Sequence, residues 1–130
     1  MRCLGEVVDG QVFHSRIGAV VAEEWLKIPT HYPRVHLDEW IVMPDHVHGI
    51  LIFQGQSTTE TKQGSKHLRP GSLGAAIGTF KSDATKRIWR NLKNLDFAWQ
   101  PRFHDVIVHT PEDLERVRAY IRENPKRWKP

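Results

Sequence analysis

The feature that most limits how this chain can fold is a pair of β-rich runs that meet at a Pro-Asp step. The first run, RVHLDEWIVM, starts at Arg34, and the second, HVHGILIF, ends at Phe53. Both are rich in β-branched and aromatic residues, which favour strands, and Pro44-Asp45 between them is typical of a tight turn. The stretch therefore predicts an antiparallel hairpin.

Turn, capping and periodicity signals predict further segments on both sides of this hairpin. In chain order they are a hairpin over residues 6–13 that turns at Asp9-Gly10, a helix that follows Ser15 and stops at Pro29, a polar, mobile loop over 54–70, a helix that begins at Ser72, a strand over 103–108, and a helix from the Thr110 cap to Asn124-Pro125. This order predicts one α+β domain over residues 1–130, with helices packed on an antiparallel sheet.

The composition excludes several classes of protein. A chain of 130 residues fits one domain, and its single cysteine excludes internal disulfides and thiolate metal clusters, which suits a reducing cytoplasm. No apolar run approaches the roughly 20 residues of a membrane helix, and the N-terminus lacks the pattern of a signal peptide. We therefore expect a cytoplasmic protein with no membrane partner.

Positive charge is concentrated in the middle of the chain. Residues 62–102 contain 9 Lys/Arg against 2 Asp/Glu, whereas residues 1–61 contain 4 against 8. Lys81, Lys86 and Arg90 lie away from the apolar stripe of their predicted helix. The pattern is typical of a surface that binds a polyanion, and it is equally compatible with a merely solvated helix face.

His46-Val47-His48 is the first pattern that suggests chemistry. Residues two apart on a strand point to the same face, so both imidazoles can reach one metal ion while Val47 enters the core. Imidazole is a common ligand of transition metals. The alternative is a pair of histidines on the exposed face of a sheet, and the spacing alone does not exclude it.

Tyr120 and Asn124 are the second such pattern. They stand four residues apart in the last predicted helix, so their side chains lie one above the other on the same face. The alternatives are a partly buried core tyrosine and an asparagine of the kind favoured before proline near a helix end. Spacing does not reject either alternative.

Several motifs along the chain together resemble the single-tyrosine HUH transposases, and most nearly the REP-associated tyrosine transposases of bacteria. In order they are residues 40–52 (WIVMPDHVHGILI), 72–74 (SLG), 80–82 (FKS), 85–87 (TKR), 99–100 (WQ), 103–105 (FHD) and 120–125 (YIRENP). The similarity covers nearly all of residues 4–128 apart from the polar loop.

The resemblance implies a ferredoxin-like (RRM-like) sheet and a metal-dependent DNA strand transferase. His46, His48 and the side-chain oxygen of Asn124 would hold Mg²⁺ or Mn²⁺, which would act on the scissile phosphate as a Lewis acid. The Tyr120 hydroxyl would attack single-stranded DNA, leaving a 5′-phosphotyrosine link and a free 3′-hydroxyl. Attack by another 3′-hydroxyl would rejoin the strands, as in DNA transposition.

The resemblance also implies the partner, which is a DNA hairpin with its single-stranded flank. The candidate phosphate contacts are Lys81, Lys86, Arg87 and Arg90. Trp89 or His67 could stack on unpaired bases, and Trp89 is equally suited to packing against the sheet. Related transposases act as monomers or as homodimers with shared sites, and a bacterial protein of this kind would lie on the nucleoid when bound to DNA.

The sequence departs from the family pattern at its start. Relatives carry a strand upstream of the region that matches Leu4 to Phe13, and this strand borders the histidine strand, so we expect a sheet that lacks the family's first strand. That departure supports an alternative, a non-catalytic or decayed DNA-binding remnant of the same family. A third possibility is a zinc hydrolase that uses His46, His48 and His104.

Overall fold

The computed structural model describes residues 3–54, 73–94, 97–99 and 107–128. Over these ranges the chain is α+β, with two separate two-stranded antiparallel sheets, β1–β2 and β3–β4. The elements are β1 (Gly5–Val8), β2 (Gln11–His14), α1 (Arg16–Leu26), α2 (Ile28–His31), β3 (Val35–Val42), β4 (Val47–Phe53), α4 (Leu73–Asn91) and α5 (Pro111–Arg127).

The expected central hairpin is formed by β3 and β4. Val42 pairs with Val47, and the Met43 N–H donates to the His46 carbonyl at 2.7 Å, so Pro44 and Asp45 form the tip of the turn. The ladder shifts register between Leu37 and Trp40, which leaves two residues of β3 opposite one residue of β4. This β-bulge has one extra residue, which kinks β3 and lets the side chains of residues 38 and 39 point toward the same face.

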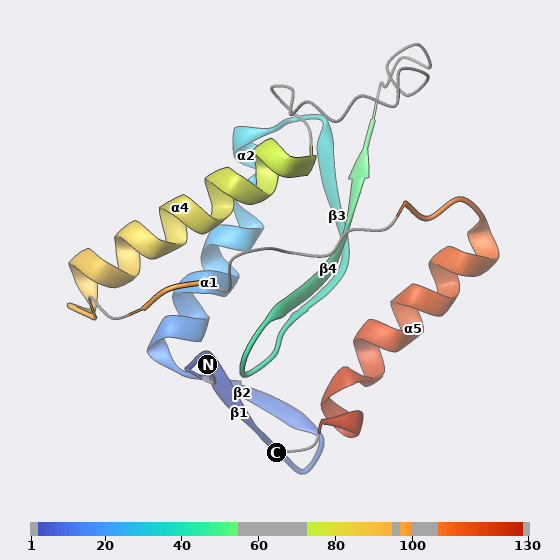
Figure 1. The fold of residues 1–130 in the computed structure, drawn as a ribbon. Helices are drawn as coiled ribbons and strands as arrows, with labels where there is room; N and C mark the ends of the chain where they lie inside the picture. Colours follow the sequence, from blue (N-terminus) through green and yellow to red (C-terminus); the bar gives the residue numbers. More distant parts are fainter. Residues whose placement is uncertain (1–2, 55–72, 95–96, 100–106, 129–130) are drawn as a thin grey trace.

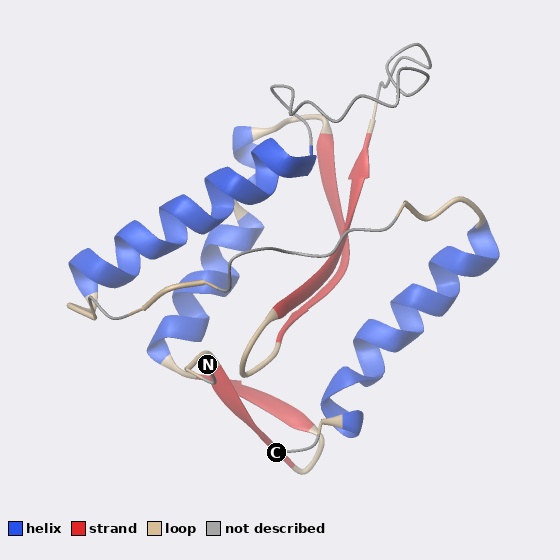
Figure 2. Cartoon of the chain, viewed as in Figure 1, coloured by secondary structure: helices blue, strands red, loops and turns tan. Residues whose placement is uncertain are grey.

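The central hairpin lies between two groups of helices (Figures 1 and 2). The helices α1 and α4 pack together on one side of it, and α5 crosses the other side, where it contacts β3, β4 and β2. Because successive residues of a strand face opposite ways, β4 directs alternate side chains to α1 and to α5. Among the described helices, none is long and apolar enough to cross a membrane.

The main core fills the space between the hairpin and the α1–α4 pair. Trp25 of α1 lies at its centre, edge-on to Phe80 of α4 at a centroid distance of 5.1 Å and tilted against Trp40 of β3 at 6.3 Å. Such aromatic pairs add to the free energy gained from burying the rings themselves. A smaller apolar contact lies on the other face, where Ile121 of α5 is buried. The hairpin is thus covered on both faces.

The first hairpin forms as its Asp-Gly signal predicts. Asp9 and Gly10 adopt positive φ angles of 53° and 75°, the conformation that a two-residue turn between twisted strands requires. Beside this hairpin, the Leu4 N–H donates to the Pro44 carbonyl at 3.0 Å, and the Ser15 hydroxyl accepts from the Gly18 N–H at 3.0 Å to cap α1. The N-terminal hairpin is therefore fastened next to the turn that carries His46.

Two predicted helix ends are wrong, and proline is involved in both. The helix α1 ends at Leu26, and Pro29 does not stop a helix there but lies in the first turn of the short helix α2. The last helix does not end at Asn124-Pro125, because Pro125 is buried inside α5, which continues to Arg127. Proline is tolerated in a first turn, and in a last turn it removes only one of the remaining hydrogen bonds.

Of the remaining predictions, one is confirmed, and the others are not confirmed or lie wholly or partly outside the described residues. The Thr110 cap is confirmed, since its hydroxyl accepts from the Asp113 N–H at 3.0 Å. Of the strand expected over 103–108, residues 103–106 lie outside the described residues, and Ile107 and Val108 are not in a strand. Residues 55–70 of the expected loop, and Ser72 at the expected start of α4, also lie outside the described ranges.

We expect Gly49→Ala to destabilise the fold by about 1–3 kcal/mol. A Cβ atom at Gly49 would lie 2.5 Å from a ring carbon of Trp25 and 2.9 Å from the Cβ of Trp40, so the core would have to shift. Thermal and urea unfolding would measure the loss. The matched control is Gly78→Ala on α4, where a Cβ meets nothing within 4 Å and helix propensity predicts stabilisation by up to about 1 kcal/mol. Equal stability of Gly49→Ala and the wild type would contradict the packing of α1 on the histidine strand.

Candidate active site on the α5 face of the hairpin

The expectation that both histidines lie on one strand is confirmed only for His48, the second residue of β4, since His46 lies in the turn before the strand. His46 is exposed in the turn itself, and its Nδ1 lies 2.7 Å from the Asp45 carboxylate. Gly49 faces Trp25 of α1, so its neighbour His48 points to the opposite face, toward α5. Burial lowers the pKa of His48, and electrostatic repulsion from the nearby His46 lowers it further. His48 is therefore held in the neutral form, which is the form that binds metals.

Two residues of α5 reach His48 from across the hairpin. The side-chain amide of Asn124 lies 3.4 Å from the His48 Nδ1, and the ring of Tyr120 stands edge-on to the His48 imidazole at a centroid distance of 5.6 Å. Tyr120 is 52% exposed, so it is not the core tyrosine that its sequence position also allowed. The structure thus brings together His48, Tyr120 and Asn124, with His46 beside them on the turn.

The donor chemistry of this cluster fits a divalent ion. Its donors are two imidazole nitrogens and one amide oxygen, and rotation of the Asn124 amide by half a turn presents either its oxygen or its nitrogen to His48. The Asp45 carboxylate at His46 Nδ1 leaves the Nε2 atom of His46 for a ligand. In the described part of the chain no three His, Cys, Asp or Glu side chains form a metal-binding group, and the present set has two histidines and one asparagine.

Arg127 is a residue of this cluster that the sequence reasoning missed. Its guanidinium lies 4.1 Å from the centroid of the Tyr120 ring, and its Nη2 donates to the Tyr120 carbonyl at 2.7 Å. The available signal was its position seven residues after Tyr120, two turns along the same helix face. Arg127 places a positive charge directly beside the tyrosine.

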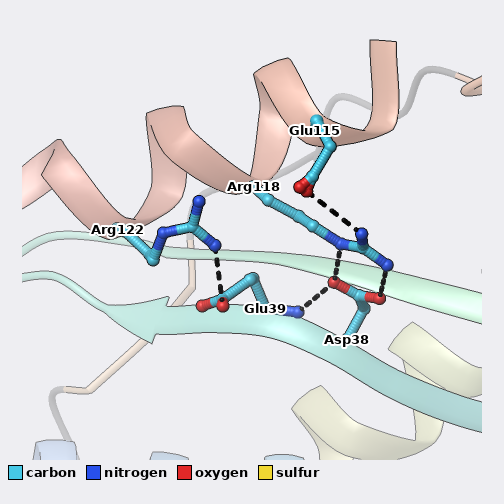
Figure 3. Close-up of polar contacts among 5 residues, drawn as sticks. All are labelled: Asp38, Glu39, Glu115, Arg118 and Arg122. Carbon is cyan, nitrogen blue, oxygen red and sulfur yellow. Dashed lines mark hydrogen bonds and ion pairs between the residues drawn. The ribbon is translucent and has the colours of Figure 1, made fainter. Parts of the chain in front are cut away.

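A set of ion pairs holds the opposite flank of α5, and the sequence reasoning missed it too (Figure 3). Arg118 donates to both carboxylate oxygens of Asp38, at 2.8 Å from Nε and 2.7 Å from Nη2. Arg122 donates to Glu39 at 3.0 Å. Both carboxylates come from the bulge of β3, and no sequence signal connects a bulge to a helix some 80 residues later.

The Asp38–Arg118 pair predicts a dependence of stability on pH. Hydrogen bonds from Arg118 lower the pKa of Asp38 and outweigh burial, which alone would raise it. A lowered folded-state pKa contributes stability that is present above the unfolded value of about 3.9 and is lost as the pH falls through the folded value.

We therefore expect Asp38→Asn to reduce the free energy of unfolding at pH 7 and to reduce it progressively less below about pH 4. Urea unfolding of both proteins at several pH values measures this difference. A difference that stays constant from pH 7 to pH 2 would contradict the account.

Arg87 of α4 is committed to an ion-pair network inside the protein. It donates to Glu24 at 2.8 Å and lies 2.9 Å from Glu23, while Lys27 donates to Glu24 at 3.1 Å. The Glu24 side chain is only 4% exposed. Burial would raise the pKa of Glu24, but hydrogen bonds from Arg87 and Lys27 lower it below its ordinary value. The charge of Arg87 is thus already neutralised by carboxylates of α1.

The other predicted phosphate contacts also lie on α4. Lys86 and Arg90 are exposed, whereas Lys81 is half-buried over the Trp99 ring, and burial lowers its pKa. Trp89 is exposed, and its indole N–H donates to the Phe97 carbonyl at 3.1 Å. Because α4 and α5 cover opposite sides of the hairpin, the structure does not bring these side chains to Tyr120 (Figure 1). His67 and His104 fall outside the described ranges.

Comparison with known proteins gives a similarity along the chain but no family. No protein-family model matches the chain, and no solved structure matches it significantly. The chain is similar to a Haemophilus influenzae protein described as uncharacterized, at 27% identity over 139 residues, which covers 97% of this chain and 74% of the relative. The similarity extends along nearly the whole chain and carries no statement of activity.

Proposed function

We propose that this protein is a metal-dependent strand transferase of the single-tyrosine HUH kind, which cuts and rejoins single-stranded DNA. The observation that carries the proposal is that His48 contacts both Tyr120 and Asn124 of α5. His48 touches Asn124 at 3.4 Å and Tyr120 edge-on at 5.6 Å. These residues are also parts of the two motifs that most resemble the family, residues 40–52 and 120–125.

The metal ion would be held by His46, His48 and Asn124. Nitrogen ligands suit Mn²⁺ better than Mg²⁺, and positions left to water and phosphate oxygen make either ion workable. When bound, the ion supplies Lewis-acid activation and orientation of the scissile phosphate. The protein's own contribution is to keep His48 neutral by burial and to fix the His46 ring through Asp45.

Tyr120 is the nucleophile of the proposed reaction. Its hydroxyl oxygen forms a bond to phosphorus while the bond from phosphorus to the 3′ oxygen breaks. The phenolic proton is lost, and the departing 3′ oxygen takes up a proton, so the products are a 5′-phosphotyrosine link and a 3′-hydroxyl. Half of the Tyr120 surface is open to solvent, so a DNA strand can approach it. Attack of another 3′-hydroxyl on the link runs the step backwards and joins two strands.

The proposed site is complete within one chain, in a ferredoxin-like arrangement of the sheet. The antiparallel hairpin β3–β4 with helices packed on it would be one part of this arrangement. Tyr120 and Asn124 reach His48 of their own chain, so the proposed site could act in a monomer or within each copy of a homodimer. Such a protein would lie in the bacterial cytoplasm and would be bound to the nucleoid when it holds its DNA substrate.

The DNA partner would extend from α5 to α4. Lys86 and Arg90 are exposed on α4, on the far side of the hairpin from Tyr120. A DNA hairpin with a single-stranded flank is long enough to touch both sides, with its duplex on α4 and the cleaved strand on α5. Arg87 takes no part in this surface, because Glu23 and Glu24 already hold it.

We expect Lys86→Glu and Arg90→Glu each to weaken binding of a hairpin oligonucleotide and to flatten its salt dependence. Each lost phosphate contact reduces the magnitude of the negative slope of log K against log salt concentration by about 0.7–0.9. Fluorescence anisotropy at several salt concentrations measures both quantities. The matched control is Lys126→Glu, which reverses the same charge on α5. An equal or larger effect of Lys126→Glu would mean that the duplex lies along α5 instead.

A DNA-binding protein without cleavage is the second candidate function. The separation of the basic α4 side chains from Tyr120 favours it, because binding on α4 needs nothing from the histidine cluster. A cleavage assay with an end-labelled hairpin oligonucleotide, with and without Mn²⁺, distinguishes the two. Metal-dependent cleavage supports the transferase, and tight binding with no cleavage supports the second candidate. Zn²⁺-dependent hydrolysis that persists in Tyr120→Phe would support a zinc hydrolase.

A further inference from the structure

The helix α5 presents three kinds of side chain to the hairpin. Residues three apart in a helix are offset by about 60° around its axis, so Arg118, Ile121 and Asn124 lie side by side across α5. Arg118 pairs with Asp38, Ile121 is buried, and Asn124 touches His48. The ion pairs and the candidate catalytic residues therefore flank the same buried stripe.

The apolar stripe alone does not fix how α5 is rotated. Non-directional contacts of side chains such as Ile121 tolerate a small turn of the helix, whereas hydrogen-bonded pairs do not. The Arg118–Asp38 pair is bidentate, which adds geometric specificity, and its carboxylate is mostly shielded, with 12% of the side chain exposed. One helical turn later, Arg122 pairs with Glu39. Two ion pairs on one flank of α5 therefore oppose rotation of the helix toward its other flank.

The bulge of β3 is what makes both pairs possible. In a regular strand Asp38 and Glu39 would face opposite sides, one toward α5 and one toward α1. The extra residue between Leu37 and Trp40 lets both carboxylates reach α5, and the Glu39 N–H donates to Asp38 Oδ1 at 2.7 Å, which holds the Asp38 carboxylate in place.

We propose that Asp38 and Glu39, through Arg118 and Arg122, are positioning residues that set the rotation of α5 and so hold Tyr120 and Asn124 against His48. The expected effect on the reaction rate rests on the proposed function, whereas the expected effect on the rotation of α5 does not. Loss of the Asp38 charge lets Arg118 turn to Glu115, which it already contacts at 3.3 Å, and α5 is then held by its apolar stripe and the weaker pair.

The structural role is tested first by fluorine NMR on protein labelled with 3-fluorotyrosine. The chain has two tyrosines, so two resonances are expected, and Tyr120→Phe assigns them. In Asp38→Asn, we expect the Tyr120 resonance to move or broaden. The Tyr32 resonance should stay in place, because the Tyr32 hydroxyl bonds to Ala75 and Thr79 on α4.

The catalytic role is tested by the rate of covalent adduct formation with saturating single-stranded DNA and Mn²⁺. A displacement of about 1 Å at a reacting group costs about 10²-fold in rate, so we expect a loss of that order in Asp38→Asn. Asp38→Glu, which keeps the carboxylate, should recover much of the rate. The control Glu23→Gln removes a carboxylate from an arginine pair on the α1–α4 side and should leave the rate unchanged.

The outcomes separate this inference from the proposed function. An unchanged Tyr120 resonance together with an unchanged rate in both Asp38→Asn and Glu39→Gln overturns the inference, as does an equal loss of rate in Glu23→Gln. A shifted Tyr120 resonance in a protein that forms no adduct even as wild type supports the positioning role and refutes the transferase. If Asp38→Asn does not fold, Glu39→Gln decides, because the Glu39–Arg122 pair is more exposed and its loss costs less stability.

Discussion

A Tyr120→Phe variant is expected to form no covalent adduct with single-stranded DNA, while the wild type forms one in the presence of Mn²⁺. The substitution removes only the hydroxyl oxygen that would bond to phosphorus, and loss of a nucleophile lowers a rate by several orders of magnitude. Because Tyr120 is 52% exposed, the fold should be unaffected. An oligonucleotide labelled at its 3′ end would carry the label into the adduct on a denaturing gel.

The chain offers a matched control in its other tyrosine. Tyr32→Phe removes a hydroxyl that bonds to Ala75 and Thr79, so it should cost about 1 kcal/mol of stability and leave the adduct intact. Mass spectrometry of a digest should place the DNA on the peptide that contains Tyr120. Adduct formation by Tyr120→Phe, or an adduct mapped to Tyr32, would refute the assignment of the nucleophile.

An Arg87→Met variant is expected to lose up to about 3 kcal/mol of unfolding free energy, the lower end of the range for a buried charge that loses its partner, because Lys27 still pairs with Glu24. Glu24 is 4% exposed, and Arg87 donates to it at 2.8 Å. Lys27 remains, but it is more than half exposed and makes one contact with Glu24 at 3.1 Å. Urea unfolding followed by circular dichroism measures the loss. Arg116→Met is the control, because its exposed pair with Asp113 should contribute little.

A double variant tests the explanation. Glu24→Leu with Arg87→Met replaces the buried pair by apolar side chains of similar size and should recover most of the lost stability. Because this double variant should fold, it also tests whether Arg87 contributes to DNA binding. We expect its affinity for the hairpin oligonucleotide to be close to that of the wild type. Failure to recover stability would contradict the role of the buried Glu24 charge, which Lys27 alone pairs in the single variant. A large loss of affinity would return Arg87 to the DNA surface.

Local signals in the sequence were sufficient where the structure is decided by neighbouring residues. The Asp9-Gly10 and Pro44-Asp45 turns and the Ser15 and Thr110 caps depend on contacts within a few residues, and each lies where it was predicted. Reliance on such local signals also explains why the predicted end of the last helix is wrong. A proline such as Pro125 disfavours a preceding helical residue, but in α5 Pro125 is buried and the helix continues past it to Arg127.

The sequence by itself determined which side chains share a face. The period of a strand sets His48 on the side of β4 opposite to Gly49, and the period of a helix sets Tyr120 and Asn124 on one side of α5. Neither period says that the two faces meet. That meeting is a property of the packed chain, in which Asn124 lies 3.4 Å from a histidine that precedes it by 76 residues.

Only the tertiary structure decided how α5 is held and what Arg87 does. Asp38 and Arg118 are 80 residues apart, and Glu24 and Arg87 are 63 apart, so no local pattern relates them. Both pairs depend on packing that brings two elements together and excludes water from a carboxylate, and in the first case also on an irregularity in β3. A charged residue looks the same in sequence whether it meets solvent, DNA or a partner in the fold, because its environment is set by the elements that pack around it.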